Sequence, residues 1–100
     1  MPRDDVSKTN KNKSLDKQVV FQFYAPQADK VELAGTFNDW NPSDNPLERD
    51  KKGKWTVKLK LAPGCYEYRF LIDDTWHNDQ SPVKCVPNAF GSWNCVIEIT

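Results

Sequence analysis

Four tryptophans in this chain of 100 residues are the side chains best suited to dock another molecule, and their surroundings divide them into two pairs. Trp55 and Trp93 each open a run in which apolar and polar residues alternate, so we expect both rings in a hydrophobic core. Trp40 and Trp76 stand instead among polar, turn-forming residues. An indole in such a segment tends to be exposed, which is costly unless something docks on it. The alternative is that both rings fold back over the edge of the domain.

Flat aromatic rings suit sugars, and the chain also carries the polar groups that a sugar site needs. The axial C–H groups of a glucose ring form an apolar patch while its hydroxyls radiate sideways, so a site combines an aromatic platform with donors at its rim. Arg69 and Asn94 could supply such donors, and Phe90 and Ser92 bring a ring and a hydroxyl just before Asn94. A solvated strand face explains Arg69 and Asn94 equally well. Spacing alone does not decide between the two.

Four carboxylates raise the question of catalysis, because hydrolysis of a glycosidic bond needs a pair of them at a fixed separation. The candidates are Asp73, Asp74, Asp79 and Glu67. The three aspartates fall in one tight turn and the adjoining loop, and so short a chain leaves little room for a deep cleft. We therefore predict that the chain is not an enzyme. His77 has no Ser or Cys nucleophile beside it and is expected to be a solvent-facing loop residue.

The three cysteines, Cys65, Cys85 and Cys95, favour a reducing environment. Their number is odd and the first residues do not resemble a secretory signal, so we expect free thiols and a cytoplasmic location. A disulfide between two of them stays an open alternative. The cysteines form no Cys-x-x-Cys pair and the chain has one histidine, so we predict no metal site and no cofactor.

The balance of charge argues against nucleic acid as a partner. Lys plus Arg and Asp plus Glu each number 14, which gives no formal net charge and a pI of about 6.5. A nucleic-acid binder normally presents a basic face and a high pI. No apolar stretch approaches the length of a membrane span, so no membrane partner is expected either.

Hydropathy divides the chain into a polar arm and one domain. Residues 1–17 are charged and polar, and we interpret them as a flexible arm or linker. From residue 18 onward, short segments alternate apolar with polar residues between turn signals, and no window carries a helical stripe. The expected strands are residues 18–25, 30–35, 55–61, 66–72 and 93–100, with a short edge strand at 47–49. Residues 18–100 are therefore predicted to be all-β, an immunoglobulin-like (early-set) antiparallel β-sandwich.

Several segments, in order along the domain, resemble the family 48 carbohydrate-binding modules. Residues 31–40, VELAGTFNDW, are similar to the family's opening VxLxGxFNxW, and residues 46–49, PLER, to its PLxR. The further matches are residues 53–70 with GxW…LxPGxYxYKF, residues 73–79 with DGxWxxDP, and residues 90–94, FGSWN, with LGTVNN. The family includes the glycogen-binding domain of AMP-activated protein kinase β subunits and the N-terminal domains of branching and debranching enzymes.

The resemblance implies a set of sugar-binding residues and a function. The matching positions are Trp40 and Trp76 at two stacking tryptophans, Arg69 at a lysine that reaches glucose hydroxyls, Phe90 at a leucine that presses on the glucan, Ser92 at a threonine, and Asn94 at an asparagine that hydrogen-bonds a sugar. The resemblance thus implies non-catalytic binding of α-1,4/α-1,6-glucans such as glycogen, starch or maltooligosaccharides. The alternative is a protein-interaction or domain-docking module of a glucan-metabolising enzyme or a kinase complex.

The chain departs from the family pattern at three positions. Asp74 stands where the family has glycine, so the turn must change its geometry or hold an aspartate in the left-handed region. Gln80 replaces the proline after Asp79, from which we expect a looser loop. Cys95 replaces the second asparagine of the family's pair. These departures bear on the shape of the loops more than on the presence of a site.

Overall fold

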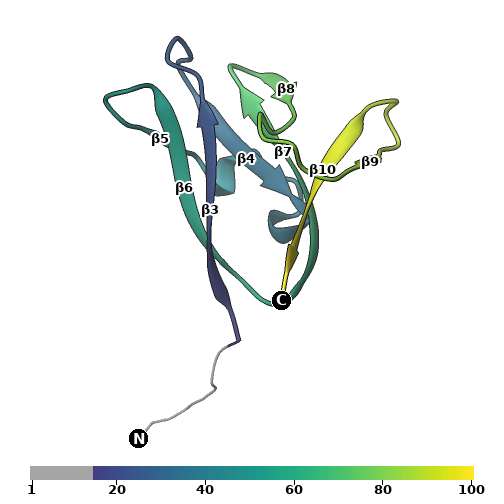
Figure 1. Cartoon of the computed structure of the whole chain (residues 1–100). Coiled ribbons are helices and arrows are strands. Elements are labelled where there is room, and N and C mark those ends of the chain that lie inside the picture. Colours follow the sequence, from purple (N-terminus) through teal and green to yellow (C-terminus); the bar gives the residue numbers. More distant parts are fainter. Residues whose placement is uncertain (1–14) are drawn as a thin grey trace, which may run out of the picture.

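The computed structural model describes residues 15–100, which form two antiparallel β-sheets packed face to face (Figure 1). The predicted arm of residues 1–17 lies outside the described part of the chain except for its last three residues. The last of these, Lys17, already pairs with Leu61, so the first strand begins one residue earlier than expected.

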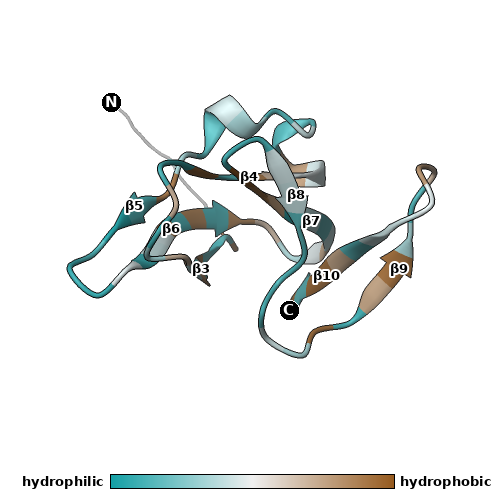
Figure 2. Cartoon of the chain, turned by 90° about the horizontal axis from the view of Figure 1, so that it is seen from above, coloured by the Kyte–Doolittle hydropathy of each residue, from teal (hydrophilic) through white to brown (hydrophobic). Residues whose placement is uncertain are grey.

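The smaller sheet has three strands, in the order β3, β6, β5. Its strands are β3 (Lys17–Tyr24), β6 (Lys54–Leu61) and β5 (Glu48–Arg49), the last at the predicted short edge strand. Phe21 and Phe23 of β3 are buried while their neighbours are not, as period-two alternation predicts, and Figure 2 shows apolar and polar residues following one another along β6. Trp55 pairs with Phe23 and is 8% exposed, which confirms its predicted place in the core.

The larger sheet has five strands and positions most of the candidate residues. Its strands are β4 (Val31–Gly35), β7 (Gly64–Ile72), β8 (Thr75–His77), β9 (Cys85–Pro87) and β10 (Trp93–Ile99). Strand β7 is central, because it pairs with β4 along one edge and with both β8 and β10 along the other. Strand β9 pairs with β10 at the end of the sheet.

The core lies between the sheets and is rich in aromatic rings. Phe70 and Cys95 of the larger sheet are completely buried. Phe21 packs edge-on against Tyr68 with ring centroids 5.1 Å apart, and Phe23 packs against Phe70 at 5.0 Å. These contacts join the two sheets, and each buried ring contributes roughly 2 kcal/mol of hydrophobic stabilisation. The predicted all-β, immunoglobulin-like sandwich is confirmed.

The expectation that Trp93 is buried is wrong, since this side chain is 53% exposed. Its direction is as predicted, because Trp93 lies on the same side of β10 as the buried Cys95. Trp93 pairs with Pro87, and the β9–β10 hairpin runs out on the side of the molecule away from β3, β5 and β6 (Figures 1 and 2). Alternation predicts which way a side chain points, but the opposite sheet must reach that far to bury it.

Residues 73–92 contain two short strands that the sequence did not reveal. Strand β8 places Trp76 on a strand rather than in a loop; His77, also on β8, is exposed as expected. All three residues of β8 are exposed, so no alternation marks this strand. The helices of the described residues are two short 3₁₀ turns, η1 (Thr36–Asn38) and η2 (Pro42–Asp44), and neither could cross a lipid bilayer.

Candidate functional site

A groove of about 700 Å³ lies over the outer face of the larger sheet. Glu67 and Arg69 face it because they alternate along β7 with Tyr68 and Phe70, which point into the core. The full lining consists of Trp40, Glu67, Arg69, Trp76, Pro87, Asn88, Ala89, Phe90 and Asn94. Five of the six predicted site residues are therefore brought together, and Ser92 is not among the lining residues.

Trp76 reaches the groove through a tight hairpin turn. Asp73 and Asp74 join β7 to β8 with φ angles of 48° and 68°, the left-handed values of a two-residue hairpin turn. Of the two possibilities stated for Asp74, the structure adopts the left-handed aspartate. The register then sets Trp76 opposite Leu71 on the outer face, where it is 42% exposed.

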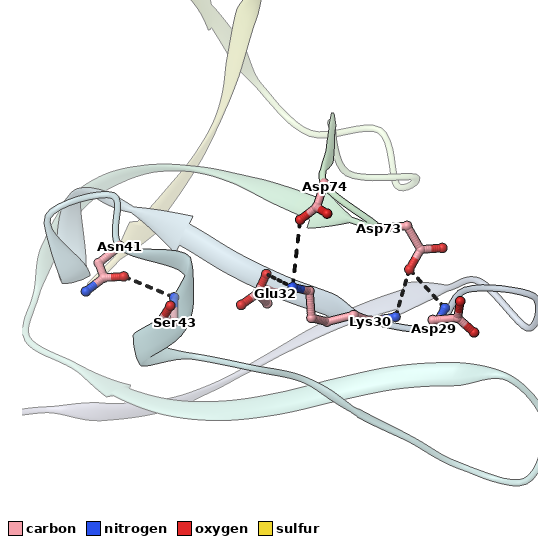
Figure 3. A network of polar contacts seen from close by, with 7 residues as sticks. All are labelled: Asp29, Lys30, Glu32, Asn41, Ser43, Asp73 and Asp74. Atoms are coloured by element: carbon pink, nitrogen blue, oxygen red, sulfur yellow. Dashed lines mark hydrogen bonds and ion pairs between the residues drawn. The ribbon is translucent and has the colours of Figure 1, made fainter.

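The same turn is fastened to the residues that lead into β4 (Figure 3). The Asp73 carboxylate accepts hydrogen bonds from the backbone N–H groups of Asp29 and Lys30, each at 2.9 Å. The Lys30 ammonium lies 3.7 Å from a carboxylate oxygen of Asp74 and 3.7 Å from one of Glu32. These contacts hold the hairpin, and with it Trp76, in place against the sheet.

Trp40 lies at the end of a turn that the Asn38 side chain holds together. The Asn38 amide accepts a hydrogen bond from the Gly35 N–H at 3.0 Å and donates to the Leu33 carbonyl at 3.0 Å and to the Asn45 side chain at 2.6 Å. The backbone N–H of Trp40 closes the turn by donating to the Gly35 carbonyl at 2.9 Å. The asparagine of the FNDW motif therefore has a structural role.

The backbone of this turn is strained at the two residues that bring the Trp40 ring to the groove. Asp39 and Trp40 have φ angles of 54° and 59°, a left-handed conformation that costs about 1 kcal/mol or more for a bulky residue. A glycine is needed at position 35, where this turn begins, because a Cβ there would collide with the Glu67 carbonyl oxygen. Beyond the turn, the Asn41 side chain accepts from the Ser43 N–H at 3.1 Å and caps η2 (Figure 3). The strained turn delivers the indole of Trp40 to the groove.

Arg69 and Asn94 supply the polar rim in different ways. The Arg69 Nε donates to the Asn78 Oδ1 at 2.8 Å, and the guanidinium carbon lies 6.0 Å from the centroid of the Trp76 ring, within range of a cation–π contact. The terminal amino groups of Arg69 make no hydrogen bond within the described part of the chain. Asn94 is only 8% exposed and donates from Nδ2 to the Glu67 Oε1 at 3.0 Å, so it is not a solvated strand residue.

The loop between β9 and β10 carries Phe90, whose side chain is 93% exposed. The Asn88 Oδ1 accepts hydrogen bonds from the N–H groups of Phe90 at 2.9 Å and Ser92 at 3.1 Å, and the Ser92 carbonyl accepts from the Asn88 N–H at 3.0 Å. Gly91 has a φ of 78°, which suits glycine. Ser92 thus contributes its backbone to the shape of the loop, and the structure does not place its hydroxyl in the groove lining.

Four lining residues were not predicted as parts of a binding site: Glu67, Pro87, Asn88 and Ala89. Glu67 stands two residues before Arg69 on the same strand, so period-two alternation alone could have placed both on one face. Asn88 and its neighbours gave no such signal, because the β9–β10 hairpin that positions them was not predicted.

The segment after β8 is anchored on its inner side. The Tyr68 hydroxyl donates to the Asp79 Oδ2 at 2.7 Å, and the Asp79 N–H donates to the Cys95 Sγ at 3.2 Å. Burial first, and the Asp79 carboxylate second, raise the pKa of Tyr68 well above its usual value. Gln80, from which a looser loop is expected, pairs through its side-chain amide with both the N–H (2.7 Å) and the carbonyl (2.8 Å) of Tyr24.

The carboxylates considered for catalysis are dispersed. Glu67 is the one acidic residue among those lining the groove. Asp73 and Asp74 are engaged at the hairpin turn, and Asp79 accepts from Tyr68. The described residues contain no group of three or more His, Cys, Asp or Glu that could hold a metal ion, and their three cysteines are free.

Comparison with known proteins places these features in a family. Residues 8–89 match the family described as Carbohydrate-binding module 48 (Isoamylase N-terminal domain). The chain is 31% identical over 83 residues to "Protein FLOURY ENDOSPERM 6, chloroplastic" of Oryza sativa subsp. japonica, and 27% identical over 84 residues to "Phosphoglucan phosphatase DSP4, amyloplastic" of Castanea sativa. It is 37% identical over 75 residues to "1,4-alpha-glucan branching enzyme GlgB" of Bacillus caldolyticus.

These relatives are much longer than the chain. The first two matches cover 83% of this chain but only 15% of the rice protein and 22% of the chestnut protein. The match to the Bacillus caldolyticus enzyme covers 72% of this chain and 11% of that enzyme. The family match spans most of the sandwich, including the turn with Trp40, the hairpin with Trp76 and part of the β9–β10 loop. The chain therefore belongs to the family 48 carbohydrate-binding modules.

Proposed function

We propose that the groove binds α-1,4/α-1,6-linked glucans, such as glycogen, starch or maltooligosaccharides, and that the chain catalyses no reaction on them. The observation that carries this proposal is that Trp40 and Trp76, delivered by separate turns, line one groove together with Arg69 and Asn94. Two aromatic platforms with polar groups at their rim match the apolar faces and lateral hydroxyls of a glucan chain.

The polar groups of the groove have hydrogen-bonding capacity left for sugar hydroxyls. The terminal amino groups of Arg69 can donate, and the second Nδ2 proton of Asn94 remains after its bond to Glu67. Phe90, which also lines the groove and is highly exposed, offers a further ring for stacking.

The relatives support glucan as the ligand. One is named a 1,4-α-glucan branching enzyme and another a phosphoglucan phosphatase. The finer likeness, to the glycogen-binding domain of AMP-activated protein kinase β subunits, belongs to this proposal as well, because a suitable residue type fills each of the six positions. The module would then tether a larger enzyme or kinase complex to its polysaccharide.

The absence of catalysis rests on where the carboxylates lie. A glycosidase needs two carboxyl groups that flank the scissile bond, and Glu67 has no second carboxylate among the residues lining the groove. Incubation with a chromogenic maltooligosaccharide tests this part, and we expect no release of the chromophore. The cytoplasmic location stays a prediction from the cysteine count, whereas the rice and chestnut relatives are named as chloroplastic and amyloplastic proteins.

A second candidate function is docking to another protein domain. It is favoured by Trp93, which is 53% exposed on the other side of β10 from the groove. Such docking could accompany glucan binding, because the two surfaces use different residues.

Co-sedimentation with glycogen or insoluble starch tests the primary function. We expect the wild type to sediment, and Trp40→Ala and Trp76→Ala each to lose most of the binding while keeping the fold. A stacked ring of this kind contributes about 2 kcal/mol or more. Circular dichroism serves as the control for folding. Equal sedimentation of the wild type and both variants would contradict the proposal.

A further inference from the structure

We infer that Glu67 is a positioning residue for this groove. Through Asn94 and then Asn88, its carboxylate fixes the loop that carries Phe90. The inference rests on the proposed function for its effect on glucan binding, but the arrangement of the loop can be tested without any ligand.

The chemistry of each hydrogen bond fixes the orientation of the next, starting at the loop. The Asn88 Oδ1 accepts from the backbone N–H groups of both Phe90 and Ser92, so this end of the amide must be the oxygen. The Asn88 Nδ2 therefore points the other way and donates to the Asn94 Oδ1 at 3.0 Å. Asn94 must then present its Nδ2 to Glu67, which accepts at 3.0 Å. A carboxylate can only accept hydrogen bonds, so it suits the end of this series of hydrogen bonds.

The hydrogen bonds from Glu67 through Asn94 to Asn88 form a relay, and the fold holds its two ends with different firmness. Glu67 lies on the central strand β7, in register with Val96 of β10, and its N–H donates to the Thr36 Oγ1 at 3.2 Å. Phe90 is 93% exposed, so hydrophobic burial does little to fix its loop. Apart from the hydrogen bond from the Asn88 N–H to the Ser92 carbonyl, the loop depends on the Asn88 side chain for its shape. The relay thus transmits order from the sheet to the loop.

The consequence is a loop that is arranged before the ligand arrives. Without an acceptor at position 67, the Asn94 amide loses the partner that holds its Nδ2 in place, and Asn88 loses its fixed neighbour. Ordering of the Phe90 loop would then have to occur during binding, which weakens affinity. The effect of Glu67 on the glucan should therefore pass largely through Phe90.

A pair of variants of similar length separates the acceptor from the packing of the side chain. Glu67→Met removes the acceptor, whereas Glu67→Gln keeps an oxygen for Asn94. By isothermal titration with maltoheptaose we expect Glu67→Met to weaken binding roughly threefold to tenfold and Glu67→Gln to stay within about twofold of the wild type. Glu98→Ala, at an exposed position of β10 outside the groove lining, should leave binding unchanged.

A double-mutant cycle with Phe90→Ala then tests the route. If Glu67 acts through the loop, Glu67→Met should have little further effect in the Phe90→Ala background. An undiminished effect in that background would mean direct contact with the sugar and would overturn the inference.

Hydrogen exchange of the free protein completes the test. We expect the Phe90 and Ser92 amides to exchange faster in Glu67→Met than in the wild type or Glu67→Gln, with the exchange of Phe70 in the core unchanged. Equal exchange at Phe90 and Ser92 in all three proteins would refute the relay. If the wild type bound no maltoheptaose, the proposed function would fail. Hydrogen exchange of the free protein would still show whether Glu67 orders the loop through the relay. Should Glu67→Met not fold, Glu67→Leu, which also lacks an acceptor but keeps a bulky side chain, takes its place in the comparison.

Discussion

The two faces of the larger sheet carry neighbouring residues of the same strands but have opposite characters. On the inner face, Tyr68 and Cys95 are buried, and the Tyr68 hydroxyl is bonded to Asp79. On the outer face, Glu67 and Asn94 line an open groove and are bonded to each other. One register of pairing between β7 and β10 sets both patterns, because it aligns Tyr68 with Cys95 and Glu67 with Val96.

Trp93 shows that an exposed aromatic ring is not by itself a binding site. It belongs to the inner face by alternation, yet it is more exposed, at 53%, than Trp76 at 42%. Trp93 is not among the residues that line the groove, whereas Trp76 lines it together with Trp40 and the Arg69 guanidinium. The convergence of rings and polar groups, rather than the exposure of one ring, marks the candidate site. If this contrast is correct, outer-face changes should alter binding and inner-face changes should alter stability.

The largest effect is expected from a matched pair of tryptophan replacements. Trp76→Ala should weaken binding of maltoheptaose by about 2 kcal/mol or more, roughly thirtyfold, because it removes a stacking platform. Trp93→Ala removes an equally large and more exposed ring and should leave the affinity unchanged. Isothermal titration measures both. Equal losses in the two variants would break the contrast between the faces.

The turn that delivers Trp40 provides the next test. Asn38→Ala removes three side-chain hydrogen bonds and should lower the free energy of unfolding by about 2 kcal/mol. The left-handed backbone at Trp40 would lose its support, so glucan affinity should fall as well. Urea unfolding and titration report the two quantities. Asn41→Ala, which affects only an exposed cap, is the control, and an affinity loss as large in it would contradict the role assigned to Asn38.

Arg69 should contribute less than a stacking tryptophan. Arg69→Ala removes charged donors at the rim and should weaken binding by about 1.5 kcal/mol, close to tenfold. Arg69→Lys keeps the charge but loses the planar fork and the bond from Nε to Asn78, so its affinity should lie in between. Unchanged affinity in Arg69→Ala would remove Arg69 from the site.

On the inner face, Tyr68 should make the free energy of unfolding depend on pH. Burial, with Asp79 as the second cause, raises the pKa of Tyr68 above its usual value near 10. The unfolded chain releases this proton at a lower pH than the folded chain, so the folded state loses stability as the pH rises above about 10. Tyr68→Phe should remove that part of the decline and leave glucan affinity at neutral pH unchanged. Urea unfolding at about pH 8 and pH 11 tests this, and an identical decline in Tyr68→Phe would contradict it.

Most of the sandwich could be predicted because its long strands alternate clearly. Strands β3, β6, β7 and β10 begin and end within about two residues of the predicted ranges. Strands β8 and β9 escaped prediction because each has three residues, and neither shows the buried and exposed alternation that marks a strand.

The candidate site was predictable as a set of residue types, but its arrangement was not. The resemblance selected five residues that line the groove, whereas Asn88 became visible only when the β9–β10 hairpin was placed beside β7. Gln80 shows the same limit, since its partner Tyr24 lies 56 residues away in the chain. Such pairings depend on tertiary contacts that no local pattern encodes.

The indole N–H signals of the four tryptophans in a ¹H–¹⁵N spectrum, recorded during titration with maltoheptaose, show which rings meet the glucan. We expect the signals of Trp40 and Trp76 to shift together with the same dissociation constant, while those of Trp55 and Trp93 stay in place. Shifts confined to Trp93, or no shift at either Trp40 or Trp76, would contradict this expectation.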